Sequence, residues 1–378
     1  MKIGILTQPL HNNYGGLLQC YALQTILKRM NHEVWVVCRD YDKYSLLFRV
    51  KFCIKQKIKS LLGLKGVKLP NPKKIKYISK YTSHFIGKYI QPKTMILRSN
   101  SELKRCCDIE NFDAYIIGSD QVWRPEYSPC ITNYFLDFLP LENKARRISY
   151  AASFGVDEWN FTNEETSICA RLIQNFNAVS VREDSAIPLC HKYLQRDDVV
   201  QVLDPTLLLD WEDYVRLVME ENEMVNDGNL FYYILDNTNE KQEIVDLISS
   251  QVKMKPFTKM PKRFASYENL NRNIEECVFP SVTSWIRAFM DAEMVVTDSF
   301  HGCVFSIIFN KPFWVIANSL RGMARINSLL TQFGLEDRII IIDKLPYNFS
   351  IPIEWNLITE KREALKTKSL RYLNNALE

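Results

Sequence analysis

Several features that define large protein classes are missing from this sequence of 378 residues. No apolar run approaches the roughly 20 residues that a membrane-spanning helix needs. The first ten residues, MKIGILTQPL, turn polar too early for a signal peptide and are more typical of a buried strand. The ten cysteines form no C-x-x-C pair and the five histidines are scattered. We therefore expect no metal site, and reduced thiols in a cytoplasmic protein.

The sequence also lacks an even distribution of charge. Its net charge is +4, yet residues 43–105 hold 17 lysines and arginines against a single acid, Glu102. The rest of the chain has 31 basic and 43 acidic residues. With 47% hydrophobic and 24% charged residues, the chain is not expected to be disordered. It is a mildly acidic globular protein that carries a strongly basic insert, 43–105.

Short apolar runs alternate with helical patterns along the chain, which predicts parallel sheets covered on both faces. The expected strands are Lys2–Thr7, Glu33–Val37, Ala114–Ile117, Ile148–Ala151, Ala178–Val181, Val199–Leu203, Asn229–Leu235, Lys253–Phe257, Glu293–Thr297, Pro312–Ala317 and Ile339–Ile342. We predict an α/β protein with two Rossmann-like doubly wound domains, 1–209 and 210–345. In the tail, 346–378, a charged amphipathic helix is expected to pack back on the first domain. Ligands of such units bind outside the carboxyl ends of the strands, in a cleft.

The first candidate binding loop follows the first expected strand. It contains Asn13, Gly15 and Gly16, and Gln19 lies on the helix that it opens. Free backbone N–H groups at a helix start attract anions, and glycine allows a ligand to approach closely. The loop is not a G-x-G-x-x-G motif, so dinucleotide binding is not predicted. The alternative is a strand–helix turn that needs glycine for its geometry alone.

The second candidate is the segment that carries Ser119 and Asp120, directly after the strand Ala114–Ile117. Polar side chains at the carboxyl end of a strand are placed to contact a ligand. Asp120 could orient a sugar hydroxyl or accept its proton. The alternative is that one of the two side chains caps the next element.

The third candidate is Arg182, which ends the strand Ala178–Val181 and is expected to point towards the rim of the cleft. A guanidinium there suits bidentate binding of a phosphate or a carboxylate. The alternative is an ion pair with Glu183 or Asp184.

The fourth candidate combines Ser299 and His301, where the strand Glu293–Thr297 gives way to a helix. A histidine at this end of a strand, beside a glycine, could face the cleft as an acid, a base or an anion ligand. Asp298 or Ser299 could instead only cap the helix.

The fifth candidate follows the strand Pro312–Ala317 and comprises Asn318, Arg321 and Arg325. Two arginines near a helix start are unfavourable unless an anion is bound there. Solvated arginines are the alternative. By themselves the five segments indicate a two-domain enzyme that binds a small anion and a polar partner.

Six motifs, in their order along the chain, resemble those of the polysaccharide pyruvyl transferase family. They are Ile3–Thr7 with Asn13–Gly16, Gly118–Trp123, Ser149–Gly155, Ser180–Glu183, Asp204–Thr206 and Thr297–Gly302. The resemblance implies a GT-B-like fold without a nucleotide-sugar donor. It also implies transfer of pyruvate from phosphoenolpyruvate to a sugar, usually as a ketal on two hydroxyls, with no cofactor.

The resemblance also implies roles for residues. His301 matches the family's histidine at the donor site, and Arg182 matches its donor-binding arginine. Some branches have an arginine two residues before the histidine, where this chain has Ser299, so that anion contact is missing or supplied elsewhere. Arg321 is the nearest match to a basic residue that follows the next strand. Our hypothesis is that His301 is the acid or base and that Asp120 is a base for the acceptor.

The basic insert lies outside the matched motifs. On a helix, Val50, Ile54, Ile58 and Leu61 would share one face, with lysines beside it. Such a helix can lie on anionic lipid, which would suit a lipid-linked acceptor at the inner membrane face. A solvated helix packed on the first domain is the alternative, and no recognised module supports nucleic-acid binding.

Two other functions stay open at this point. A glycosyltransferase that uses a nucleotide sugar would share the architecture. The other possibility is a non-catalytic protein that binds sugar or acts as a membrane scaffold. Such a protein would release phosphate neither from phosphoenolpyruvate nor from a nucleotide sugar.

Overall fold

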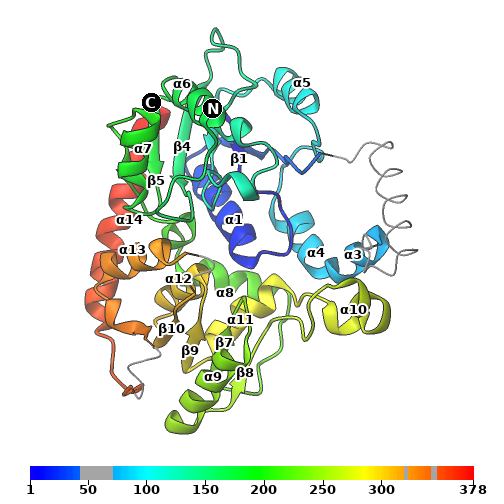
Figure 1. Cartoon of the computed structure of the whole chain (residues 1–378), viewed down its shortest axis with the longest axis vertical. Coiled ribbons are helices and arrows are strands. Elements are labelled where there is room, and N and C mark those ends of the chain that lie inside the picture. Colours follow the sequence, from blue (N-terminus) through cyan, green and yellow to red (C-terminus); the bar gives the residue numbers. More distant parts are fainter. Residues whose placement is uncertain (43–70, 319–321, 342–346) are drawn as a thin grey trace.

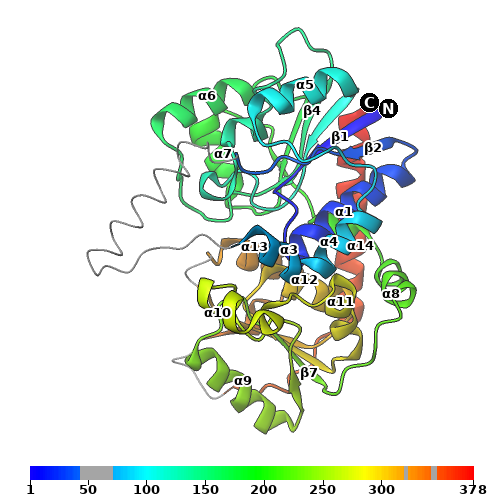
Figure 2. The same cartoon turned by 90° about the vertical axis from the view of Figure 1, so that its right-hand side faces the viewer.

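The fold consists of two parallel sheets with helices around them, one above the other in Figures 1 and 2. It was obtained as a computed structural model, which describes residues 1–42, 71–318, 322–341 and 347–378. The predicted class, two Rossmann-like doubly wound α/β units, is confirmed by these sheets.

The first sheet has the strand order β2-β1-β3-β4-β5-β6. Its strands are β1 (Lys2–Leu6), β2 (Glu33–Val36), β3 (Ala114–Ile117), β4 (Arg146–Ala152), β5 (Ala178–Val181) and β6 (Val200–Gln201). The helices of this unit are α1 (Tyr14–Arg29), α3 (Pro72–Ile78), α4 (Lys80–Tyr89), α5 (Asn100–Glu110), α6 (Asn163–Ile173), α7 (Ala186–Leu194) and the 3-10 turns η1 (Pro125–Tyr127), η2 (Ile131–Phe135) and η3 (Pro205–Leu208). The strand order reverses between β1 and β3, which is where such a sheet opens a binding crevice.

The second sheet has the order β11-β10-β9-β7-β8 and therefore reverses between β7 and β9. Its strands are β7 (Leu230–Tyr233), β8 (Pro256–Phe257), β9 (Met294–Thr297), β10 (Phe313–Ile316) and β11 (Ile339–Ile340). The helices are α8 (Trp211–Glu220), α9 (Asn239–Val252), α10 (Tyr267–Arg272), α11 (Val282–Asp291), α12 (Phe300–Ile308), α13 (Ala324–Phe333), α14 (Trp355–Leu377) and the 3-10 turns η4 (Ile274–Cys277) and η6 (Glu336–Arg338). The two crevices face the boundary between the units.

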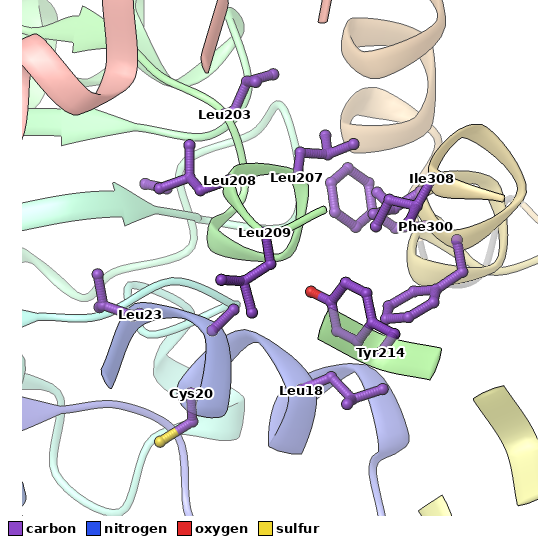
Figure 3. Packing of buried hydrophobic residues seen from close by; sticks show 14 of the residues in the cluster. Leu18, Cys20, Leu23, Leu203, Leu207, Leu208, Leu209, Tyr214, Phe300 and Ile308 are labelled. Atoms are coloured by element: carbon purple, nitrogen blue, oxygen red, sulfur yellow. The ribbon is translucent and has the colours of Figure 1, made fainter. Parts of the chain in front are cut away.

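Part of the boundary between the two units is an apolar core. The connection from β6 to α8 sends Leu207, Leu208 and Leu209 into it, and all three side chains are buried. Figure 3 shows these leucines in one cluster with Leu18 of α1 and Phe300 of α12. Burying a leucine stabilises a fold by roughly 1.5–3 kcal/mol. This packing therefore holds the two units in one relative position.

The last helix, α14, returns to the first unit, and Figure 1 shows it running along both. Arg362 donates to the carbonyl oxygens of Leu207 and Leu209. Further along, the hydroxyl of Tyr372 donates to the Ser149 carbonyl of β4 at 2.8 Å. The helix therefore joins the second unit to β4 of the first sheet.

The described part of the basic insert, residues 71–105, also connects the units. Phe85 of α4 packs edge-on against Tyr21 of α1, with ring centroids 6.0 Å apart. Lys88 of α4 forms a salt bridge of 2.7 Å with Glu221, the residue after α8. The predicted helical face from Val50 to Leu61 lies outside the described residues. The described part of the insert packs through Phe85 on the first unit and through Lys88 on the second.

Among the helices of the described segments, none combines the length and the apolar character that a membrane span needs.

Candidate active site

A pocket of about 350 Å³ lies at the boundary, where loops from both sheets meet. Four of the five candidate segments contribute to its lining. The lining residues are His11, Asn12, Asn13, Tyr14, Asp120, Gln121, Tyr233, Leu235, Met260, Phe279, Asp298, Ser299, Phe300, His301, Gly322, Arg325 and Ile326. The volume lies within the range of small-molecule sites.

His301 reaches the pocket from the first turn of α12 and packs against the start of α1. A Cβ built on Gly15 would lie 2.0 Å from its Nδ1, far inside contact distance. Only glycine therefore fits this place in the loop. Figure 2 shows α12 lower in the view than α1, on the other side of this boundary. From the sequence, Gly15 was expected to leave space for a ligand. In the structure that space is occupied by the ring of His301.

The other ring nitrogen of His301 faces Asp204, which follows β6. The distance between Nε2 and Oδ2 is 3.6 Å. The same carboxylate accepts from Ser119 Oγ at 3.0 Å and from Thr206 Oγ1 at 2.6 Å. Burial raises the pKa of Asp204, but His301 and Arg182 lower it by more, so its pKa lies well below the ordinary range. Asp204 is an anion that can stabilise an imidazolium at His301.

Arg182 does not face the cleft rim, contrary to its predicted position. Its side chain is 1% exposed and is absent from the pocket lining. Nη1 donates to Asp204 at 2.8 Å and Nη2 to Asp120 at 3.5 Å, while the guanidinium lies 4.3 Å from the ring centroid of Phe300. Burial lowers the pKa of Arg182, but Asp204 and Asp120 raise it above its ordinary value. Nε of Arg182 also lies 3.9 Å from Oε2 of Glu183, the ion-pair partner that the sequence offered as the alternative. The arginine lies behind the pocket because these three carboxylates surround it there.

Asp120 is part of the pocket wall and has the backbone of a left-handed turn, with φ of 73°. Asn13 donates to its Oδ2 at 3.3 Å, while Arg182 binds Oδ1. A Cβ on Gly16 would lie 3.2 Å from the same Oδ2. The loop after β1 thus packs closely on Asp120, and both candidate segments form one wall.

Gln19 and Ser119 are fully buried and do not line the pocket. Gln19 donates to Thr7 Oγ1 at 2.8 Å and to the Gly16 carbonyl at 2.9 Å. Ser119 donates to Asp204. Both residues were predicted to contact a ligand. In the structure they instead hydrogen-bond to residues next to the pocket wall and stabilise it.

A buried polar cluster lies below the pocket in the second unit. Asp298, at the end of β9, accepts from Lys241 Nζ at 2.7 Å and from the Leu235 backbone at 2.7 Å. Asn318 donates to the same carboxylate at 3.0 Å and is not among the lining residues. Ser299 lines the pocket beside Asp298. This cluster fixes the turn from which α12 and His301 begin.

Arg325 is the arginine that lines the pocket, from the first turn of α13. Burial, together with the charge of Arg182, lowers the pKa of Arg325 to about 10. A cation in such a place favours a bound anion. Arg321 lies outside the described residues.

The family of this chain follows from comparison with known proteins. The family model described as polysaccharide pyruvyl transferase matches residues 13–319, which include Asp120, Asp204 and His301 but not Arg325. The chain belongs to this family. A comparison with curated proteins found no match.

Among solved structures, the UDP-GlcNAc 2-epimerase from Neisseria meningitidis bound to UDP-GlcNAc is similar, with 10% identity and a TM-score of 0.49. It aligns over 100% of this chain and 94% of its own. UGT71G1 from Medicago truncatula complexed with UDP-glucose has 11% identity and a TM-score of 0.47 over 100% and 98% of the two chains.

Two residues of this pyruvyl transferase family member were missing from the predicted site. Asp204 binds Arg182 and faces His301, and Lys241 binds Asp298. The Asp204-Pro205-Thr206 motif was a signal for the first, because a turn directly after a strand places its acid at the edge of the sheet. Lys241 lies within a helix, 57 residues from its partner, and no local pattern marks it. Among the described residues, no group of three or more His, Cys, Asp or Glu could hold a metal ion.

Proposed function

We propose that this chain transfers pyruvate from phosphoenolpyruvate to two hydroxyls of a sugar in a polysaccharide or a lipid-linked oligosaccharide. The observation that carries the proposal is the position of His301. It lies between Gly15 and Asp204 of the first unit, in the wall of a small pocket that Asp120 and Arg325 also line. An acid or base, a counter-ion, a second carboxylate and an anion-binding cation thus meet in one place.

The donor is a small molecule with a carboxylate and a phosphate. Arg325 is the proposed partner for one of these anions, since it lines the pocket and neighbours Arg182. Arg182 lies behind the wall and contributes its positive charge at a distance. Removing one well-placed charge-stabilising group from an active site typically costs roughly 10²–10³ in rate.

The proposed reaction has two stages at C2 of the donor. His301 gives a proton to C3, which leaves an oxocarbenium-like C2, and a sugar hydroxyl forms a C–O bond there while losing its proton to Asp120. The C2–O bond to phosphate then breaks. A second hydroxyl of the sugar attacks C2 and loses its proton. One of the two released protons restores His301 and the other leaves with inorganic phosphate. General acid–base groups contribute about 10²–10⁴ to such steps.

The experiment that tests the proposal supplies phosphoenolpyruvate together with glycans, free and lipid-linked, from the source cell. We expect phosphate release and a pyruvylated glycan with the wild-type chain, and neither with His301→Ala. His191→Ala is the matched control, since His191 is 71% exposed in its side chain and does not line the pocket. Normal turnover by a folded His301→Ala protein would exclude the proposed role.

A thermal-shift measurement separates this proposal from a nucleotide-sugar glycosyltransferase. Phosphoenolpyruvate should raise the melting temperature, and a panel of nucleotide sugars should not. The reverse pattern would favour the glycosyltransferase, and no shift with either class would favour a non-catalytic protein. Flotation with anionic liposomes at low salt tests the proposed peripheral membrane location.

A further inference from the structure

A second and larger cavity, of about 780 Å³, lies beside the first sheet. Its walls are the chain that follows β1, the chain that follows β2, and the helices α3 and α4 of the basic insert. It therefore opens at the carboxyl ends of β1 and β2, next to the crevice where the strand order reverses. No step of the proposed mechanism uses this cavity.

The two cavities share two lining residues, His11 and Asn12. Helix α4 and the residue before it hold Asn12 in place. Its Nδ2 donates to Ser79 Oγ at 2.9 Å, and its Oδ1 accepts from Thr82 Oγ1 at 2.6 Å. A molecule in the larger cavity is therefore separated from the catalytic pocket by one fixed loop residue and its neighbour.

The larger cavity is lined by more positive than negative charge. Asp40 is the acid among its described lining residues, and Arg98 forms a salt bridge of 3.3 Å with it. Lys76 and Lys93 also line the cavity, and within the described part of the chain neither forms a salt bridge with a carboxylate. Two ammonium groups without a carboxylate partner beside a cavity are complementary to an anionic ligand.

The floor of the same cavity is apolar. Leu10 of the loop after β1, Val36 of β2 and Ile86 of α4 line it. A ligand that fits both features has oxygen-rich anionic groups and C–H faces that can rest on aliphatic side chains. A neutral sugar would use the floor and leave the lysines unused.

We propose that this cavity binds the sugar acceptor and that Lys76 and Lys93 bind a carboxylate or phosphate on that sugar. The inference deepens the proposed function and rests on it. It assigns to α3 and α4 the role of an acceptor wall. The acceptor sugar then extends past Asn12 to place its reacting hydroxyls beside Asp120.

The test compares three probes by calorimetry on the full chain: methyl glucuronide, glucose 1-phosphate and methyl glucoside. We expect the charged probes to bind about tenfold more tightly than the neutral one, because a hydrogen bond to a charged group contributes about that much to affinity. Lys76→Met with Lys93→Met should remove that tenfold preference. Lys73→Met with Lys104→Met is the control, because it removes the same charge from residues that do not line the cavity. Tighter binding of methyl glucuronide would indicate that the acceptor carries a carboxylate on the sugar. Tighter binding of glucose 1-phosphate would indicate that the lysines bind a phosphate attached to the sugar.

Equal affinities for all three probes, or an unchanged preference after removal of Lys76 and Lys93, would overturn the inference. The proposed function is read separately, from the melting-temperature shift with phosphoenolpyruvate, which the lysine variants should retain. A protein that binds the charged sugar through these lysines but shows no shift with phosphoenolpyruvate would overturn the proposed donor. The cavity would then still stand as an anionic-sugar site.

Discussion

The ring of His301 occupies the space that a side chain on Gly15 would fill, across the boundary between the two units. One residue comes from the first turn of α1 and the other from the first turn of α12. Their contact ties the proposed catalytic histidine to the first unit, so its position depends on both.

This contact makes Gly15→Ala a sensitive probe. The added methyl would lie 2.0 Å from Nδ1, so the ring or the loop must move. We expect turnover to fall by about 10²-fold, since small misplacements of reacting groups have effects of that size. Steady-state phosphate release measures it.

A double-mutant cycle supplies the control. Gly15→Ala should destabilise the wild-type chain and have little effect on a chain that already carries His301→Ala, because the clash is then gone. Equal destabilisation in both backgrounds, measured by urea unfolding, would contradict the contact.

Asp204→Asn should lower stability at pH 7 because the carboxylate neutralises Arg182 and faces His301. Breaking a buried pair typically costs about 3–5 kcal/mol. The pKa of Asp204 is lowered on folding, so its contribution is present above its unfolded pKa, about 3.9, and declines as the pH falls below that. The difference between the two proteins should therefore shrink between pH 5 and about pH 2. Unfolding curves across that range test this, with Asp227→Asn, at a side chain 94% exposed, as the control.

Arg182→Ala should destabilise the fold as well as reduce activity, because it leaves Asp204 and Asp120 without their cation. We expect a loss of about 3–5 kcal/mol. Arg182→Lys should retain part of the stability, because lysine keeps the positive charge but lacks the planar guanidinium that donates to two carboxylates at once. Calorimetric melting compares them with Arg272→Ala, an exposed pair with Glu268 that should change stability by less than about 0.5 kcal/mol.

Arg325→Met should weaken binding of phosphoenolpyruvate by about tenfold or more while it leaves the fold intact, because this arginine lines the pocket. The measurement is a titration of the donor without acceptor. Arg171→Met, on α6 and remote from the pocket lining, is the control. Unchanged donor affinity would remove Arg325 from the donor site.

Glu221→Gln should loosen the contact between α4 and the second unit. Glu221 accepts from Lys88 at 2.7 Å and from Tyr89 at 2.8 Å, and the Lys88 hydrogen bond lowers the pKa of Glu221 to about 2. A lowered carboxylate pKa stabilises the fold above about pH 4.3 and loses that effect as the pH falls towards 2. The cost of the substitution should be small, about 1 kcal/mol or less, and smaller still in high salt. Urea unfolding at two salt concentrations measures it.

The sequence predicts the strands well where both faces are buried. β3 and β5 have the predicted bounds: all four residues of β3 are buried, and so are the last three of β5. The sequence also brings Asn13, Asp120 and His301 to one pocket, because each follows a strand end. It does not predict the direction of Arg182. That direction depends on Asp204, which is 22 residues away and belongs to another strand end. The contact of α4 with Glu221, 133 residues on, has no local signal either.

The path of α14 has a consequence for how the protein is made. Leu373, Ala376 and Leu377 belong to the buried core that the first sheet shares, and Arg146 of β4 donates to the Ala376 carbonyl at 2.7 Å. Figures 1 and 2 both place the two chain ends side by side on the first unit. A ribosome makes α14 only after the whole second sheet. The first unit is therefore synthesised long before the helix that completes its core. Part of that core stays exposed to water until the second unit and α14 have been translated.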